Sequence, residues 1–346
     1  MKIGKQLIHH NLFMIGITIL LFFLVASFLY STILEKILPA PYKYLHNEKG
    51  DIMAQAPFQP SLEFPFGTDI VGNSLFYMVI DGAKYTILLC VLIGIARVIL
   101  GLLFGFLLML LPIRIKSMVK GFFDGLHFIP LSLYTFILIV PVFLFSWSFG
   151  EKSTIYAPLL VITLLSTPIL AVYLADEIGQ IYQKEFIKNA KIMGGSWWHI
   201  FNKHVRPFFF PKLIIVLLQQ VGQVLVIFAH LGILGIFIGG GDRKEVGADI
   251  KTETPIFEVF SATNEWGGLI AKYFPIFFIR PYFVLIPVAC VALTILALNF
   301  IVEGLKNVLI DENPKEVSFS KNVKKKGKSN TLKEPFTMLN KVKDLS

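Results

Sequence analysis

Long runs of apolar residues, separated by shorter polar segments, dominate the sequence. A helix that crosses a bilayer needs about 20 apolar residues, because each residue advances the helix by about 1.5 Å. Six runs reach that length, at residues 12–34, 85–112, 121–149, 155–175, 214–238 and 281–302. The first run is longer than the apolar core of a secretory signal, so we interpret it as a membrane helix. The pattern predicts an all-α membrane protein with about six transmembrane helices.

The polar segments between these runs suggest how the chain is divided. The segment before the second run holds five prolines, which argue against a long helix there. The lysine-rich end of the chain has the composition of a disordered tail. We expect an N-terminal tail (1–11), a first transmembrane helix (12–34), an extracellular segment (35–83), a transmembrane domain (84–304) with a cytoplasmic loop (176–212) and an extracellular loop (239–280), and a basic tail (305–346).

Composition and charge agree with a membrane setting and orient the chain in it. Hydrophobic residues make up 55% of the 346 and charged residues only 16%, against about 25% charged in soluble domains. With the N-terminus in the cytoplasm, the inside segments carry 21 Lys and Arg and outside segments of nearly equal length carry 9. This bias predicts that both termini are cytoplasmic. We expect the net charge of +9 to face anionic lipid and not nucleic acid.

The residues show no legible catalytic or metal site. Cys90 and Cys290 lie far apart, each within an apolar run, so neither disulfide nor metal spacing is present. Gly327-Lys328-Ser329 resembles the end of a phosphate-binding loop, but Asn322 stands where that motif needs its first glycine. We therefore expect no enzyme activity, cofactor or metal in this chain.

The cytoplasmic loop carries the most informative pattern. Phe186, Ile187, Ala190 and Met193 recur at helical spacing, which predicts an amphipathic helix. Gly194-Gly195-Ser196 should end that helix, and Ser196 is placed to cap a second one that carries Trp197 and Trp198. Pro207 should break or kink the second helix where the next span begins. Such an elbow either docks a partner protein or lies flat on the membrane interface.

This loop resembles the coupling loop of ABC importer permeases, whose consensus is Glu-Ala-Ala, three residues, Gly, nine residues, Ile-x-Leu-Pro. Ala190, Gly194 and Pro207 fall on the second Ala, the Gly and the Pro of that pattern. Lys188, Asn189, His204 and Arg206 depart from it. The wider stretch from Glu185 is closer to the dipeptide, oligopeptide and nickel branch of the family.

Other phrases resemble the same branch, in the same order along the chain. Together they cover residues 64–311, so only the termini lie outside the resemblance. The phrases are Phe66-Gly67-Thr68-Asp69 with Gly72, Phe76 and Gly82-Ala83-Lys84, then Asp124 and Pro130, then Glu265-Trp266-Gly267, and then Pro287, Ala297-Leu298-Asn299 and Glu303-Gly304-Leu305.

The resemblance implies a fold and a set of partners. The fold would be that of a type I ABC importer, with about six transmembrane helices and a cytoplasmic coupling helix. The partners would be a second permease, two cytoplasmic ATPases that bind ATP and Mg²⁺, and an extracellular solute-binding protein. The solute would be a dipeptide or oligopeptide, with nickel or another small solute as the alternative. The coupling residues would be Glu185, Lys188, Asn189, Ala190, Gly194, Gly195, Trp197, Trp198 and Pro207.

Polar residues inside the apolar runs are candidates for the translocation path. Gln219, Gln223 and His230, with Val226, step by four, three and four and so share one helical face. Such a face either lines a water-filled path or bonds to a neighbouring span. Arg97 lies in mid-span at a cost of about 2.5–3.5 kcal/mol on insertion scales. It either contacts a substrate carboxylate or, as we favour, is held by structural hydrogen bonds.

Two functions from other classes compete with the importer permease. A secondary transporter or channel would work alone, but it has no use for an ATPase-docking elbow, and paired inverted halves are not evident. A membrane-anchored sensor or scaffold would need a larger folded domain outside the membrane than these segments offer. Co-purification with an ATPase subunit would separate the three.

Overall fold

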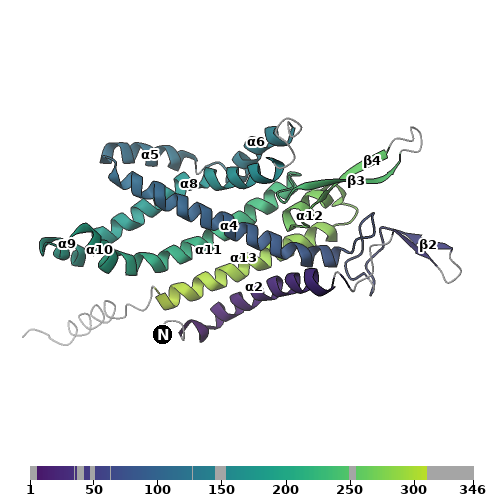
Figure 1. The fold of residues 1–346 in the computed structure, drawn as a ribbon, viewed down its shortest axis with the longest axis horizontal. Helices are drawn as coiled ribbons and strands as arrows, with labels where there is room; N and C mark the ends of the chain where they lie inside the picture. Colours follow the sequence, from purple (N-terminus) through teal and green to yellow (C-terminus); the bar gives the residue numbers. More distant parts are fainter. Residues whose placement is uncertain are drawn as a thin grey trace, which may run out of the picture.

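The computed structural model describes residues 6–34, 36, 43–46, 51–62, 64–126, 128–144, 153–248 and 255–309. Its helices form an elongated bundle, with two short β-hairpins at one end (Figure 1). Five of the helical runs described are long and apolar enough to cross a membrane, which agrees with an all-α membrane protein. They are Asn11–Leu34 (α2 Asn11–Leu29 and the π-helical η1 Tyr30–Leu34), Leu75–Leu110 (α4), Ile155–Tyr182 (within α8 Ser153–Tyr182), Trp197–Ile233 (ending in α11 Arg206–Ile233) and Tyr282–Leu309 (α13).

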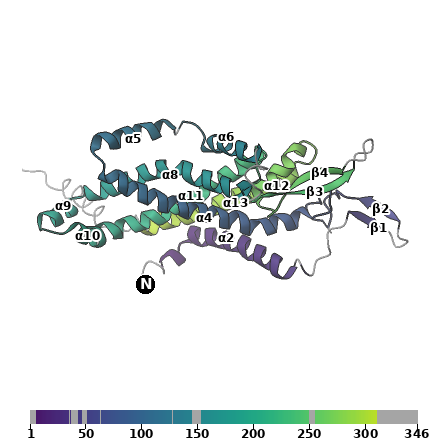
Figure 2. The same cartoon turned by 45° about the horizontal axis from the view of Figure 1, so that its top comes forward.

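The third predicted run is not one helix. Its place is taken by two helices of 14 residues, α5 (Ile113–Leu126) and α6 (Leu131–Leu144), which follow one another along the bundle (Figure 2). Pro130 lies between them, where its missing N–H and its clash with the preceding residue oppose a continuous helix. Residues 145–149, where the predicted run ends, lie outside the described part of the chain.

Helix α5 begins earlier than the sequence predicted, and its first turns carry lysines that reach α8. Residues 113–120 were expected to be a polar connection, and they are the first two turns of α5. From there Lys120 Nζ donates to Asp176 Oδ2 on α8 at 2.7 Å, and Lys116 Nζ lies 3.4 Å from Asp176 Oδ1.

Helix α4 is the centre of the bundle. It packs along α8 and also contacts α11 and α2, while α13 lies between α2 and α11 (Figures 1 and 2). Small residues allow the close approach: a Cβ on Gly105 would lie 3.0 Å from the Ala171 carbonyl oxygen of α8. Large apolar side chains remain exposed around the outside, as lipid-facing surfaces require; among them are Phe22, Leu92 and Leu107.

The hairpin end of the bundle contains the remaining short elements. These are β1 (Tyr44–His46) paired with β2 (Ile52–Gln55), β3 (Gly241–Ala248) paired with β4 (Pro255–Ser261), α12 (Trp266–Tyr273) and the 3-10 turn η3 (Phe274–Ile276). Helix α4 begins at Leu75, so the second span extends ten residues further toward this end than its apolar run indicated. The basic tail from residue 310 lies outside the described residues, and its predicted disorder stays a prediction.

Candidate functional site

The elbow between α8 and α11 forms the end of the bundle opposite the hairpins (Figure 1). Helix α9 (Glu185–Ile192) ends in a turn at Gly194, whose φ is +82°. The Gly195 N–H donates to the Ala190 carbonyl and the Gly194 N–H to the Lys191 carbonyl, both at 3.0 Å. This is the Schellman pattern, which needs a left-handed residue and therefore favours glycine.

The second half of the elbow is one helical run that continues into the membrane. Helix α10 (Trp197–Ile200) starts at Ser196, whose hydroxyl accepts from the His199 N–H at 3.3 Å, so the predicted cap is present. A π-helical turn, η2 (Phe201–Val205), follows, and Pro207 sits in the first turn of α11. The prediction was a break or a kink at Pro207, and the break is wrong: the helix continues through η2, whose wider turn directly before the proline accommodates the missing N–H.

The inner face of the elbow rests on the bundle. Ile187, Ala190 and Ile200 are buried in one cluster with Leu174 and Ile178 of α8. Of the four residues predicted to form the apolar face of α9, Met193 lies on the other side and is 81% exposed. Phe186 packs at the edge, 5.3 Å from the Phe208 ring (centroid to centroid).

The outer face of the elbow is apolar, aromatic and exposed. Trp197 and Trp198 are 59% and 64% exposed, and the Trp197 ring stacks on Phe201 at 5.7 Å. Glu185, Lys188 and Asn189 are exposed beside them. We take Lys212 of α11, in an ion pair with Glu177, as the elbow-side limit of the membrane, because charged groups are costly in hydrocarbon. Trp198 is 14 residues before Lys212 in the same helical run, roughly 20 Å further from the membrane, which argues against a helix lying in the interface.

The predicted polar face of α11 is present and uncovered. Gln219, Gln223, Val226 and His230 are all exposed on this subunit, although they lie at membrane depth. Lipid is a poor neighbour for amide and imidazole groups, so this face needs a polar surface or water opposite it. Asn299, on α13, is exposed as well.

Arg97 does not belong to that exposed face. Its side chain has no exposed surface, and its Nη2 and Nε atoms donate to the Ile162 carbonyl of α8 at 2.7 and 3.1 Å. Its Nη1 atom donates to Gln220 Oε1 at 3.3 Å. Arg97 was named as a candidate for the translocation path, and the structure corrects that assignment. Its contacts are those of a structural residue, which was the alternative that the sequence favoured. Sequence reasoning missed Gln220, although the Gln219-Gln220 pair puts amides on two sides of α11.

Two of the family-like phrases meet at the hairpin end. Asp69 is buried in a turn, where its Oδ1 accepts from the Val71 and Asn73 N–H groups and its Oδ2 lies 3.0 Å from Lys272 Nζ of α12. The Thr68 hydroxyl accepts from the Phe58 N–H at 2.8 Å. Gly67 and Gly72 flank this turn with φ of +76° and +94°. The phrase thus folds into a rigid loop tied to α12 by a buried ion pair.

The second of these motifs, Glu265-Trp266-Gly267, caps the start of α12. Glu265 is buried, and its carboxylate accepts from the Gly268 N–H at 2.7 Å and the Gly239 N–H at 3.3 Å. Burial raises the pKa of the Glu265 carboxyl, and these backbone donors oppose the rise. Trp266, also buried, donates from its indole to the Val79 carbonyl of α4 at 2.9 Å. Gly267 is buried against the Phe228 carbonyl.

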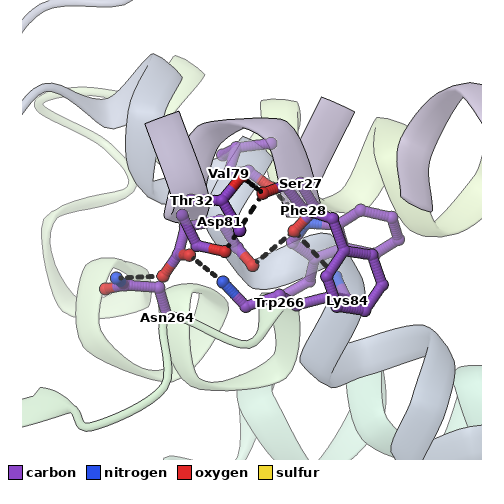
Figure 3. Close-up of polar contacts among 9 residues, drawn as sticks. Ser27, Phe28, Thr32, Val79, Asp81, Lys84, Asn264 and Trp266 are labelled. Carbon is purple, nitrogen blue, oxygen red and sulfur yellow. Dashed lines mark hydrogen bonds and ion pairs between the residues drawn. The ribbon is translucent and has the colours of Figure 1, made fainter. Parts of the chain in front are cut away.

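Figure 3 shows how the start of α4 is held between α2 and the segment before α12. Ser27 of α2 donates to the Asp81 carbonyl at 2.8 Å and accepts from the Lys84 N–H at 3.2 Å. The Asp81 carboxylate pairs with Lys84 and accepts from Asn264 Nδ2 at 3.3 Å. Gly82 allows this contact, since a Cβ there would lie 1.9 Å from the Asn264 carbonyl oxygen.

The remaining family-like residues lie apart from these groups. Asp124 is in α5, and its side chain falls outside the described part of the structure. Pro130 is exposed in the break between α5 and α6. Most of the predicted site residues therefore form three groups: the elbow, the polar face of α11, and a cluster at the hairpin end. That cluster, which we call the outer cluster, contains the Asp69 loop, the start of α4 around Asp81, and the start of α12 around Glu265.

Comparison with known proteins identifies the family of this chain. The chain is 23% identical over 270 residues to a probable D,D-dipeptide transport system permease protein, DdpC, of Escherichia coli, covering 78% of this chain and 80% of that one. It is 24% identical over 259 residues to a putative peptide permease protein of Brucella suis, covering 74% of this chain and 76% of the relative. Residues 97–311, more than half of the chain, match one family model. This range includes the elbow, α11 and residues 265–267, but not α2 or the Asp69 loop. The chain belongs to that family, the inner membrane component of binding-protein-dependent transport systems.

Proposed function

We propose that this permease imports dipeptides or oligopeptides, forms half of the translocation path, and couples that path to a separate ATPase that binds ATP and Mg²⁺. The observation that carries the coupling role is the elbow. It presents exposed tryptophans, of which Trp198 lies roughly 20 Å along the helical run from Lys212, and that run continues into α11, which is long and apolar enough to cross the membrane. A force on the elbow would therefore move α11 directly.

The exposed polar face of α11 supports a path shared with a second permease. Gln219, Gln223 and His230 need a polar neighbour at membrane depth, and a similar subunit facing them would enclose a water-filled route. Amide and imidazole groups suit a solute with peptide groups, because they offer hydrogen-bond partners to amide N–H and carbonyl groups. The permease names of the two relatives favour the same solute class.

Contacts between the two ends of the described chain support cytoplasmic termini. His10 Nε2 lies 3.2 Å from Asn307 Nδ2, so the start of α2 and the end of α13 lie at the same end of the bundle. That end is also the elbow end (Figure 1). If an ATPase docks on the elbow, both termini are cytoplasmic and the binding protein meets the outer cluster.

The test is co-purification of the permease complex with its ATPase. We expect Trp198→Ala to lower the amount of bound ATPase at least about tenfold, since a buried aromatic anchor contributes about 2 kcal/mol or more at an interface. Phe22→Ala, on the exposed side of α2, is the matched control and should retain the ATPase. Equal retention by both variants would contradict docking at the elbow.

The solute is tested separately in proteoliposomes that contain the whole complex. ATP-dependent uptake of a labelled dipeptide or tripeptide is expected, whereas uptake of nickel alone would assign the solute to the other alternative. Uptake that needs neither ATPase nor binding protein would indicate a stand-alone carrier.

A further inference from the structure

A cavity of about 330 Å³ opens at the hairpin end, between the Asp69 loop, α12 and the start of α13. Its walls are mainly apolar and aromatic, and include Phe237, Tyr273 and Phe283. Two cations line it, Lys272 and Arg280, together with one acid, Asp69. The outer cluster uses Asp69 and Lys272, but nothing described so far uses Arg280.

The charges in this cavity do not balance. Lys272 lies 3.0 Å from Asp69 and 3.4 Å from the centre of the Phe260 ring, so its charge is met within the protein. The Arg280 Nη1 atom is buried, yet no residue in the described ranges accepts a hydrogen bond from it. Arg280 also lines the cavity, and none of the ion pairs among the described residues includes it, so a cation without a counter-ion adjoins a mainly apolar space. An anion in the cavity would supply that counter-ion.

The depth of Arg280 in the membrane indicates where the anion comes from. We take the exposed Glu303 of α13 as the elbow-side limit of the membrane, because a carboxylate is costly within the hydrocarbon core. Tyr282 lies 21 residues earlier in the same helix, roughly 32 Å away, which is about the thickness of the hydrocarbon core. Arg280 therefore lies at the level of the headgroups in the leaflet opposite the elbow.

The neighbours of Arg280 are those of a residue in contact with lipid. Phe278 and Ile279, just before it, are 96% and 78% exposed. Such a pair would be unfavourable in water, whereas at this depth it contacts the part of the acyl chains next to the headgroups. A phosphodiester offers two oxygens to a guanidinium fork, which suits arginine better than lysine.

We propose that this cavity holds the phosphate headgroup of a phospholipid, with Arg280 as the anion ligand and the acyl chains against Phe278 and Ile279. The bound lipid seals the junction between α13, α12 and the Asp69 loop. The outer cluster is then held partly by a molecule of the membrane. The proposal depends on membrane insertion and not on the identity of the solute.

The test is a titration of phosphatidylglycerol into the delipidated permease complex, followed by native mass spectrometry. The wild-type complex is expected to bind one lipid more tightly than the rest, and Arg280→Gln to weaken that site at least about tenfold. Arg280→Lys, which keeps the charge and loses the fork, should fall between them. Arg114→Gln, which removes an exposed guanidinium near the elbow end, should leave the site unchanged.

Two further measurements distinguish a lipid phosphate from the other groups that could bind at this site. A diglucosyl diacylglycerol, which has acyl chains and no phosphate, should not occupy the site. Equal binding of either lipid by wild type and Arg280→Gln would overturn the proposal. So would an Arg280→Gln complex that keeps its lipid and loses affinity for the solute-binding protein, because the anion would then be a carboxylate of that protein. If Arg280→Gln does not elute as a folded complex, the comparison of Arg280→Lys with wild type decides.

Discussion

Gly194 offers the sharpest test of the elbow, because its substitution strains the backbone without creating a side-chain clash. A Cβ added there would meet no atom within 4 Å, so Gly194→Ala creates no clash. The residue nevertheless has a φ of +82°, which an alanine adopts at a cost of about 1–2 kcal/mol. The same turn carries the hydrogen bonds from Gly194 and Gly195 that end α9.

This conformational cost should lower the affinity of the ATPase for the elbow. If the ATPase binds only the elbow as it is folded here, 1–2 kcal/mol lowers the apparent affinity about 5- to 30-fold. Gly194→Asn should lose less than Gly194→Ala, since asparagine tolerates the left-handed region better. The assay is binding of the purified ATPase to the permease in nanodiscs, with transport measured in parallel.

Gly179→Ala is the matched control, because Gly179 also has open space around its Cβ but lies within α8 with an ordinary helical φ. It should leave ATPase affinity unchanged. Our reasoning would be refuted if Gly194→Ala and Gly179→Ala bound the ATPase equally well. It would also be refuted if Gly194→Asn were weaker than Gly194→Ala.

Three further predictions concern the outer cluster, the membrane interior and the coupling helix. Gly82→Ala should lower the melting temperature of the purified complex by several degrees, because its methyl group would lie 1.9 Å from the Asn264 carbonyl oxygen and overpacking costs about 1–3 kcal/mol. Arg97→Gln should lower stability by about 1–3 kcal/mol, because the Ile162 carbonyl loses its side-chain donors, while solute affinity stays unchanged. Lys188→Glu, at an exposed position of the elbow, should weaken transport without lowering the melting temperature, and an acidic-to-basic change in the ATPase groove should restore it.

Each of these has a control or an outcome that contradicts it. Gly222→Ala, where a Cβ meets nothing within 4 Å, should melt like wild type; equal melting of Gly82→Ala would contradict the close contact. A change in solute affinity in Arg97→Gln would place Arg97 on the path after all. A Lys188→Glu variant that no charge-swapped ATPase rescues would count against a charge contact at that position.

The sequence by itself determined the elements whose environment is set by nearby residues. Hydropathy located the long spans, since a bilayer requires about 20 apolar residues at each crossing. Local chemistry also located the Gly194 turn and the Ser196 cap, because a left-handed turn and a helix start depend on a few adjacent residues. The spacing of Gln219, Gln223 and His230 placed them on one face for the same reason.

Where sequence reasoning failed, another element decided the outcome. The third run was predicted as one helix, yet Pro130 interrupts it, and the charged residues taken for a connection are helical and paired with Asp176 of α8. Pro207 was predicted to break or kink the helix, and it does not break it, because the helix continues through a π-helical turn. Both errors came from judging a residue without knowing what lies beside it.

Only the tertiary structure decided which distant residues meet. It turned Arg97 inward to Ile162 and Gln220, joined Asp69 to Lys272, and set Asn264 against Gly82. It also left the buried Nη1 atom of Arg280 without an acceptor among the residues described. These contacts link residues from 65 to more than 200 positions apart. No local pattern specifies them, because they depend on how the helices pack and on the burial that results.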